Sequence, residues 1–136
     1  MTQFEGPVKA IPYDAMVVYN FLSDFTHFEH LLPPDKVTDW ESDGVSCRFK
    51  VNGVGEVGLR IVDKEPGKTI KFSADGKTPF NFFLWIQLKE KAPADSRVKV
   101  TVKADLNPMM KMMVSSPINK FLEVLTEAIA SHHYQC

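Results

Sequence analysis

A glycine pattern is the first feature of the sequence that suggests chemistry. Residues 53–58 read Gly-Val-Gly-Glu-Val-Gly, which is the spacing of the dinucleotide-binding fingerprint. That fingerprint binds a pyrophosphate only where a helix follows, because the N-terminus of the helix meets the phosphates. Here Leu59, Arg60 and Ile61 continue a strand-like alternation. We therefore interpret the glycines as a hairpin turn followed by a strand that can bend.

A pair of histidines, His27 and His30 with Glu29 between them, has a spacing that could bind a metal ion. A zinc site needs further ligands and a supporting set of hydrogen bonds around them. Neither an H-E-x-x-H pattern nor a C-x-x-C pair occurs in the sequence. We therefore interpret the histidines as solvated, and we predict neither a metal nor a cofactor.

The residues that could act as nucleophile, acid or base do not converge. Cys47 lies on the apolar side of an alternating run with no histidine in the pattern, which is typical of a buried structural thiol. The acid–base candidates fall on predicted outward faces or at strand ends: Asp39, Glu41, Glu56 and Arg60. We therefore predict no catalytic residue.

The composition is that of a globular protein with no unusual charge. The chain has 136 residues, of which 44% are hydrophobic and 24% charged, so we expect a single domain over residues 1–136. The net charge is -1 without a basic cluster, which argues against nucleic acid as a partner. No secretory signal or long apolar run is visible, so we expect no stable membrane insertion. Two cysteines without a disulfide framework favour a cytoplasmic protein.

The N-terminal part of the chain has the pattern of one strand and two short helices. Thr2–Ile11 has strand character that is weakened by Gly6 and Pro7. Helices are predicted over Ala15–Leu22, with Asp14 as the N-cap, and over Asp24–Leu32.

The rest of the chain predicts an α+β fold of antiparallel strands followed by one long helix. From Lys36 to Ala104 the apolar residues alternate with a period of two, and tight turns such as Asn52-Gly53 divide the runs. The last helix is predicted to start at Ser116-Pro117. Its apolar stripe is expected to pack on the last strand, with these side chains deeply buried together: Phe121, Leu125 and Ile129 against Val98, Val100 and Val102.

Three segments resemble the START-like helix-grip superfamily, which includes pollen-allergen-like and polyketide cyclase-like proteins. Val62–Phe72 (VDKEPGKTIKF) is similar to the third-to-fourth-strand hairpin of its small bacterial members, and Phe82–Leu88 and Ala104–Pro108 also resemble that bacterial group. The resemblance implies a curved antiparallel sheet wrapped around a long C-terminal helix, with a cavity between them. Members use that cavity for lipids, hormones or polyketide intermediates, and one branch activates a chaperone. The superfamily has no universal catalytic motif to transfer.

The functional hypothesis is a site for a small hydrophobic molecule. Four methionines in residues 109–113 precede the predicted last helix, and methionine suits adaptable apolar surfaces. With the inward aromatic and aliphatic side chains they give the predicted ligand-binding set: Phe49, Leu59, Phe72, Phe82, Met109, Met112, Phe121 and Leu125. Two alternatives stay open, a polyketide cyclase- or dehydratase-like enzyme and a protein-interaction module with a filled core.

Two aromatic side chains of the strand predicted over Phe80–Glu90 need a separate explanation. If Phe82, Leu84, Ile86 and Leu88 face the core, Phe83 and Trp85 face away from it. The segment around Phe4 could cover them, or the register could be inverted with Trp85 inside. We predict instead a homodimer that buries Phe83 and Trp85.

Overall fold

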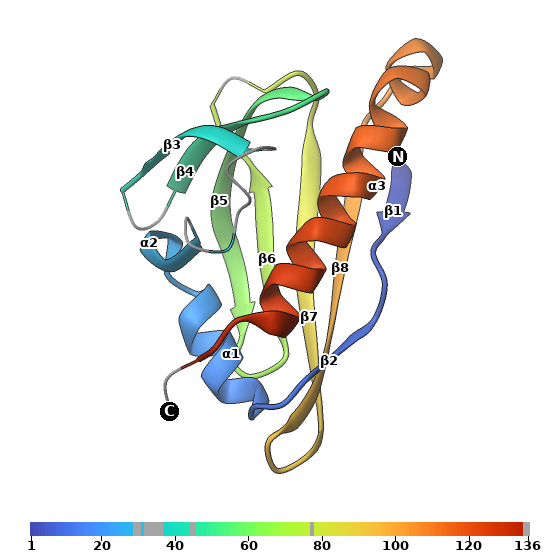
Figure 1. Ribbon diagram of the computed structural model, residues 1–136. Coiled ribbons are helices and arrows are strands. Elements are labelled where there is room, and N and C mark those ends of the chain that lie inside the picture. The colour runs from blue at the N-terminus through green and yellow to red at the C-terminus, as the bar shows by residue number, and fades with distance from the viewer. Residues whose placement is uncertain (29–30, 32–36, 44–45, 77, 135–136) are drawn as a thin grey trace.

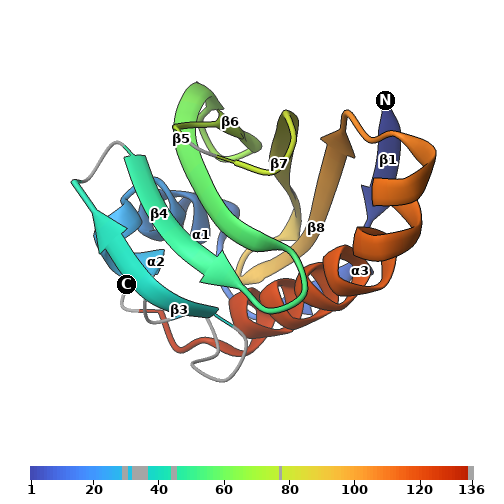
Figure 2. The same cartoon turned by 90° about the horizontal axis from the view of Figure 1, so that it is seen from above.

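An antiparallel sheet curves around one long helix (Figures 1 and 2). The computed structural model describes residues 1–28, 31, 37–43, 46–76 and 78–134, without the side chain of Thr26. The eight strands follow the order β1-β8-β7-β6-β5-β4-β3, and β2 also pairs with β8. Their bounds are β1 Thr2–Glu5, β2 Lys9–Ile11, β3 Val37–Ser42, β4 Ser46–Val51, β5 Gly55–Glu65, β6 Thr69–Ala74, β7 Phe82–Ala92 and β8 Asp95–Ala104. The predicted α+β helix-grip fold is confirmed.

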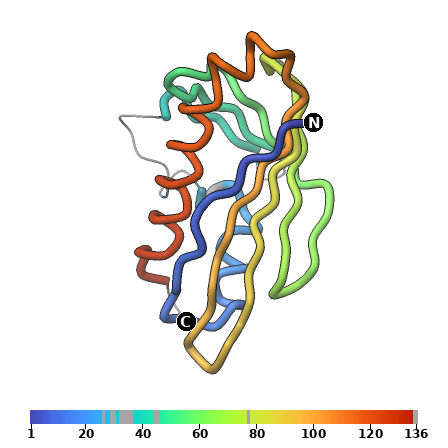
Figure 3. Tube along the Cα trace, turned by 90° about the vertical axis from the view of Figure 1, so that its right-hand side faces the viewer, coloured from blue at the N-terminus to red at the C-terminus, as the bar shows by residue number. Residues whose placement is uncertain are grey.

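The N-terminal strand is interrupted where glycine and proline weaken it. β1 and β2 are separated at Gly6-Pro7-Val8 and follow β8 along its length, as Figure 3 shows. Proline has no N–H to donate to the neighbouring strand, so the ladder cannot run on without a break. The predicted strand thus exists as two short edge segments.

The first helix is confirmed at its predicted bounds. α1 spans Ala15–Leu22, but the side chain of Asp14 does not cap it. Instead an oxygen of Glu90 accepts a hydrogen bond from the backbone N–H of Ala15 at 3.2 Å. The carboxylate of Asp14 accepts from the N–H of Ala94 in the β7–β8 turn at 2.6 Å. The two contacts join the start of α1 to the end of β7 and to the β7–β8 turn.

The second helix is short in the described part of the chain. α2 spans Phe25–Phe28. Its predicted continuation to Leu32 falls mainly on residues outside the described set, as do Glu29 and His30 of the histidine pattern.

The C-terminal helix starts nine residues earlier than predicted, at Pro108, because the same start signal occurs twice. α3 spans Pro108–Ser131. The side chain of Asn107 accepts a hydrogen bond from the N–H of Met110 at 2.8 Å. Pro108 occupies the first turn, where its missing N–H costs nothing. Pro117, predicted as the start, therefore lies inside the helix.

The two central hairpins have different turns. At Glu65–Lys68 the predicted turn is confirmed, with Gly67 at φ 73° and the N–H of Lys68 donating to the carbonyl of Glu65 at 3.0 Å. The β4–β5 loop is one residue longer than the predicted two-residue Asn-Gly turn, because the N–H of Val54 donates back to Val51 at 3.0 Å. In this loop only Gly53 has a positive φ, 86°.

The core lies between α3 and the side of the sheet formed by β1, β2 and β8, which α3 contacts. Leu125 and Ile129 are fully buried with Val98 and Val100, as predicted. Phe121 is only half-buried, so the prediction of deep burial is wrong for this residue. It lies one helical turn before Leu125 in α3.

The register of β7 is the predicted one. Its inward residues are buried against β8, with Leu84 opposite Val102 and Ile86 opposite Val100. Phe4 also points inward, opposite Val102 in the ladder, and is buried. Neither an inverted register nor the segment around Phe4 therefore accounts for Phe83 and Trp85. No helix in the described part of the chain is both long and apolar enough to cross a membrane.

Replacing Leu125 by alanine should lower the free energy of unfolding by about 2–5 kcal/mol, because the deletion leaves a hole in a packed core. Urea denaturation of wild type and variant measures the loss. Glu123→Ala, on the exposed face of the same helix, is the control and should change stability by about 0.5 kcal/mol or less. An unchanged unfolding midpoint for Leu125→Ala would show that α3 does not hold the sheet.

The contact between the β4–β5 loop and α3 can be measured by a double-mutant cycle. A Cβ added at Gly53 would lie 2.8 Å from Cγ of Pro117. Gly53→Ala should therefore destabilise the protein more in wild type than in a Pro117→Ala background, with a coupling of about 0.5 kcal/mol or more.

Gly55→Ala supplies the matched control for that cycle. Gly55 also has a positive φ, 114°, but an added Cβ there meets no atom within 4 Å. Its backbone strain should be the same in both backgrounds. Equal coupling for Gly53 and Gly55 would contradict a direct contact with Pro117.

Candidate ligand cavity

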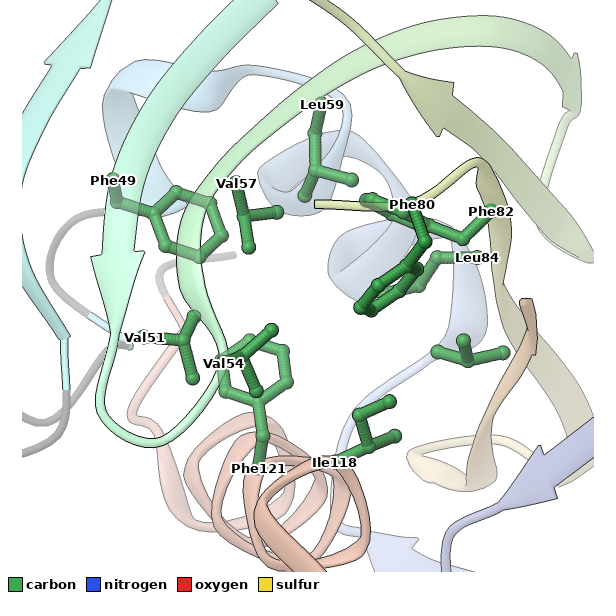
Figure 4. Close-up of a pocket in the computed structure, with 11 residues that line it drawn as sticks. Phe49, Val51, Val54, Val57, Leu59, Phe80, Phe82, Leu84, Ile118 and Phe121 are labelled. Atoms are coloured by element: carbon green, nitrogen blue, oxygen red, sulfur yellow. The ribbon is translucent and has the colours of Figure 1, made fainter. Parts of the chain in front are cut away.

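An apolar cavity of about 50 Å³ lies between the sheet and α3 (Figure 4). No polar side chain is among the eleven that line it: Phe49, Val51, Val54, Val57, Leu59, Phe80, Phe82, Leu84, Val102, Ile118 and Phe121. Eight of them are buried, and Val54, Phe80 and Phe121 are partly exposed. We call these three the mouth residues, because they are the lining side chains that solvent reaches.

Strand pairing brings the buried lining residues together. Phe49 of β4 lies opposite Val57 of β5, and Leu84 of β7 lies opposite Val102 of β8. Side chains alternate between the two faces of a sheet, so each of these residues points to the concave side. Ile118 completes the lining from α3. The cavity is therefore bounded by four strands, by α3 and by the loops that carry Val54 and Phe80.

Part of the glycine pattern lies in a strand of this wall. Gly55 and Gly58 belong to β5, so a strand follows Gly53 where the fingerprint needs a helix. A Cβ at Gly58 would lie 1.9 Å from the carbonyl oxygen of Asp75, whose own N–H donates to the carbonyl of Gly58 at 3.0 Å. Only glycine permits this approach of the two backbones. The hairpin-and-strand interpretation is confirmed.

Four of the eight predicted ligand-binding residues line the cavity, namely Phe49, Leu59, Phe82 and Phe121. Phe72 is buried deeper and does not line it. Its ring packs against Phe25 at 5.6 Å and Phe28 at 5.9 Å between ring centroids. The aromatic rings of the short helix α2 thus occupy the space beside Phe72. Leu125 is likewise a core residue outside the lining.

The two predicted methionines do not line the cavity, and this part of the prediction is wrong. Met109 is 72% exposed and Met112 is 86% exposed. The prediction placed them in the loop before the last helix, at the mouth of the pocket. They lie instead in the first turns of α3 and point into solvent, and Met113 is exposed as well.

Seven lining residues were absent from the predicted set: Val51, Val54, Val57, Phe80, Leu84, Val102 and Ile118. Most belong to inward sets that the period-two and helical patterns already mark. Val54 and Phe80 are different, because they lie in loops where no periodicity assigns a direction.

The candidate nucleophile and the acid–base candidates do not form a site. Cys47 is buried, and burial raises the pKa of its thiol to about 12, so the reactive thiolate is scarce at neutral pH. Glu41 and Glu56 form ion pairs with Arg48 at 3.3 Å and 3.7 Å. Asp39 pairs with Lys50 at 3.3 Å. These exposed charges lie off the cavity, whose lining contains none of them.

His27 is placed by contacts within its own segment. Its Nδ1 lies 3.0 Å from the carbonyl oxygen of Phe21, and its ring stacks on that of Phe21 with centroids 4.6 Å apart. Within the described ranges, no three histidine, cysteine or acidic side chains gather as metal ligands would.

Comparisons with known proteins identify the fold. No protein-family model matches the chain, and no curated protein does. Among solved structures, the Aha1 dimer from Colwellia psychrerythraea matches with a TM-score of 0.63 and 18% identity, over 96% of this chain and 98% of that one. A protein from Thermus thermophilus matches with a TM-score of 0.67 and 15% identity, over 95% and 94% of the two chains.

A third match is to one part of a longer protein. The di-domain ARO/CYC protein BexL of the BE-7585A biosynthetic pathway has a TM-score of 0.66 and 16% identity, over 95% of this chain and 46% of BexL. At these identities the likeness concerns the fold. The chain therefore has the START-like helix-grip fold.

Proposed function

We propose that the chain binds a small hydrophobic molecule, or the apolar end of a larger one, between the sheet and α3. The observation that carries this proposal is the wholly apolar lining of the cavity. Transfer of apolar ligand surface from water into such a site is favourable by about 25 cal/mol of free energy per Å² buried. Concave apolar sites of this kind are the usual place for small-molecule ligands.

The volume of the cavity sets a condition on binding. The cavity of about 50 Å³ is smaller than the roughly 150 Å³ of an apolar cavity that accepts benzene. A ligand of several carbon atoms therefore needs the mouth residues Phe80 and Phe121 to move outward. Both rings are partly exposed, so their movement disturbs the packing of the core less than that of the buried lining residues would.

An enzyme of the cyclase or dehydratase type is less well supported. BexL is described as an ARO/CYC protein. Such a reaction needs acids, bases or hydrogen-bond donors directed at the substrate. The lining residues supply no polar side chain, which favours binding over catalysis.

We further propose that residues 1–136 act as one ligand-binding domain in the cytoplasm. Cys47 is a free thiol, which suits a reducing compartment.

The cavity proposal predicts binding of 1-hexanol, with chemical-shift changes at the lining methyl groups of Val57, Leu84 and Ile118. Val57→Phe fills the cavity and should weaken binding about tenfold or more. Val98→Ile is the control, because Val98 is fully buried but does not line the cavity. NMR titration gives the affinities, and thermal unfolding shows whether each variant is folded.

Two results would contradict the cavity proposal. One is the absence of any shift at saturating hexanol. The other is equal weakening by Val57→Phe and Val98→Ile. A molecule recovered by organic extraction of the purified protein, and lost from Val57→Phe alone, would identify the natural ligand class.

We also propose that two copies associate through the outer face of β7. Phe83 and Trp85 lie side by side there, with ring centroids 6.0 Å apart. Nζ of Lys71 lies 4.7 Å from the Phe83 ring, and Nζ of Lys103 lies 5.7 Å from the Trp85 ring. The rings are only partly covered by these lysines. Aha1 from Colwellia psychrerythraea, which shares the fold, is described as a dimer.

The lysines give the association a salt dependence. A symmetric contact on this face brings Lys71 and Lys103 near their counterparts, and salt screens the repulsion. Light scattering at high micromolar protein should therefore show a dimer that strengthens with added salt. Trp85→Ser should be a monomer, whereas Lys89→Ser, an exposed change on the same strand face, should still dimerise. A wild type that stays monomeric at both salt concentrations excludes the dimer.

A further inference from the structure

A second hollow of different chemistry adjoins the cavity. It has a volume of about 270 Å³ and is lined by Val51, Asn52, Gly53, Ser116, Pro117, Lys120, Phe121 and Val124. Val51 and Phe121 line both hollows. Figure 4 shows these two side chains together with Val54 on one side of the cavity. We call the second hollow the head groove.

The residues of α3 that line the head groove form two rows along the helix. Residues four apart on a helix lie on the same face. Ser116 and Lys120 make a polar row that ends at Val124, and Pro117 and Phe121 make an apolar row beside it. The apolar row borders the cavity through Phe121. A polar and an apolar surface thus run side by side along one stretch of the helix.

The charge of the head groove is positive. Lys120 is its charged lining residue, and no carboxylate of the described residues lies within 4 Å of the Lys120 ammonium group. Acids on the neighbouring strands are already paired, Asp39 with Lys50 and Glu56 with Arg48. The ammonium group is therefore available to an anion from outside the chain.

We infer that the ligand is an amphiphile with a carboxylate at one end. Its apolar chain enters the cavity past Phe121, and its carboxylate lies in the head groove against Lys120, with Ser116 and Asn52 as hydrogen-bond donors. An ammonium–carboxylate contact is a charge-assisted hydrogen bond, which is stronger than a neutral one. This inference rests on the proposed function, because it assigns the apolar end to the same cavity.

The loop opposite the helix fixes the width of the head groove. Gly53 stands so close to Pro117 that a Cβ would lie 2.8 Å from its Cγ. Its neighbour Asn52 lines the head groove together with Ser116 and Lys120. A ligand bound here contacts both elements at once.

The test compares two ligands of equal chain length, 1-hexanol and hexanoate, by NMR titration at pH 7, where hexanoate is ionised. Wild type should bind hexanoate about twofold to fivefold more tightly, the factor expected for an exposed ion pair. Lys120→Gln should remove this preference and leave the affinity for hexanol unchanged. Lys111→Gln, an exposed lysine of α3 outside the groove, is the matched control and should keep the preference.

Each other outcome has a defined meaning. Hexanol binding without a preference for hexanoate, or an equal loss of both ligands in Lys120→Gln, overturns the inference and leaves the cavity proposal standing. Failure of both ligands to bind wild type overturns both. Acetate that binds as tightly as hexanoate would show an anion site independent of the cavity, and this also overturns the inference.

Discussion

The packing of one apolar stripe of α3 on one side of a curved sheet is the constraint on which the other features depend. The stripe contacts β1, β2 and β8, and its buried residues include Leu122, Leu125 and Ile129. The backbones of β4 and β5 lie farther from α3, and this side of the sheet meets the helix through side chains, such as the ring of Phe49 stacked on that of Phe121 with centroids 6.2 Å apart. Aromatic rings of α2 close one part of the space between sheet and helix, around Phe72. The part that stays open is the cavity.

The same geometry explains why the cavity is apolar. Along each strand that borders the cavity, successive side chains point to opposite faces of the sheet. The residues that line the cavity are therefore inward residues of the same kind as those that build the core. Polar partners of these residues face outward, where Arg48 and Lys50 pair with acids on β3 and β5. A polar group turned inward would need a hydrogen-bond partner that this lining does not provide. This lining supports the proposal of an apolar ligand rather than that of catalysis.

Periodicity in the sequence predicted the direction of the strand side chains. It did not predict how segments distant in sequence pack against one another. Alternation placed Phe49, Leu59 and Phe82 correctly, because strand direction follows from a period of two and the register from the buried face. The start of α3 was missed because Asn107-Pro108 and Ser116-Pro117 carry the same signal, and an extended helix carries the methionines into solvent. No local pattern in the sequence indicated that the rings of α2 pack around Phe72, or that the loop residues Val54 and Phe80 lie at the mouth of the cavity. Both depend on where segments distant in sequence come to rest.

Pro117 divides α3 into two parts with different tasks. A proline inside a helix removes one backbone hydrogen bond, at a cost of about 3 kcal/mol in an ordinary helix. Its ring lies against the β4–β5 loop at Gly53, so the helix is weakened where the mouth and the head groove meet. Most buried residues of α3 lie beyond Pro117, among them Leu122, Leu125 and Ile129. Before it, Met109, Met112 and Met113 are exposed. Side chains at the groove, such as Ser116 and Lys120, are exposed and therefore contribute little to the core. They can change to suit a ligand while the buried half of the same helix keeps the protein folded.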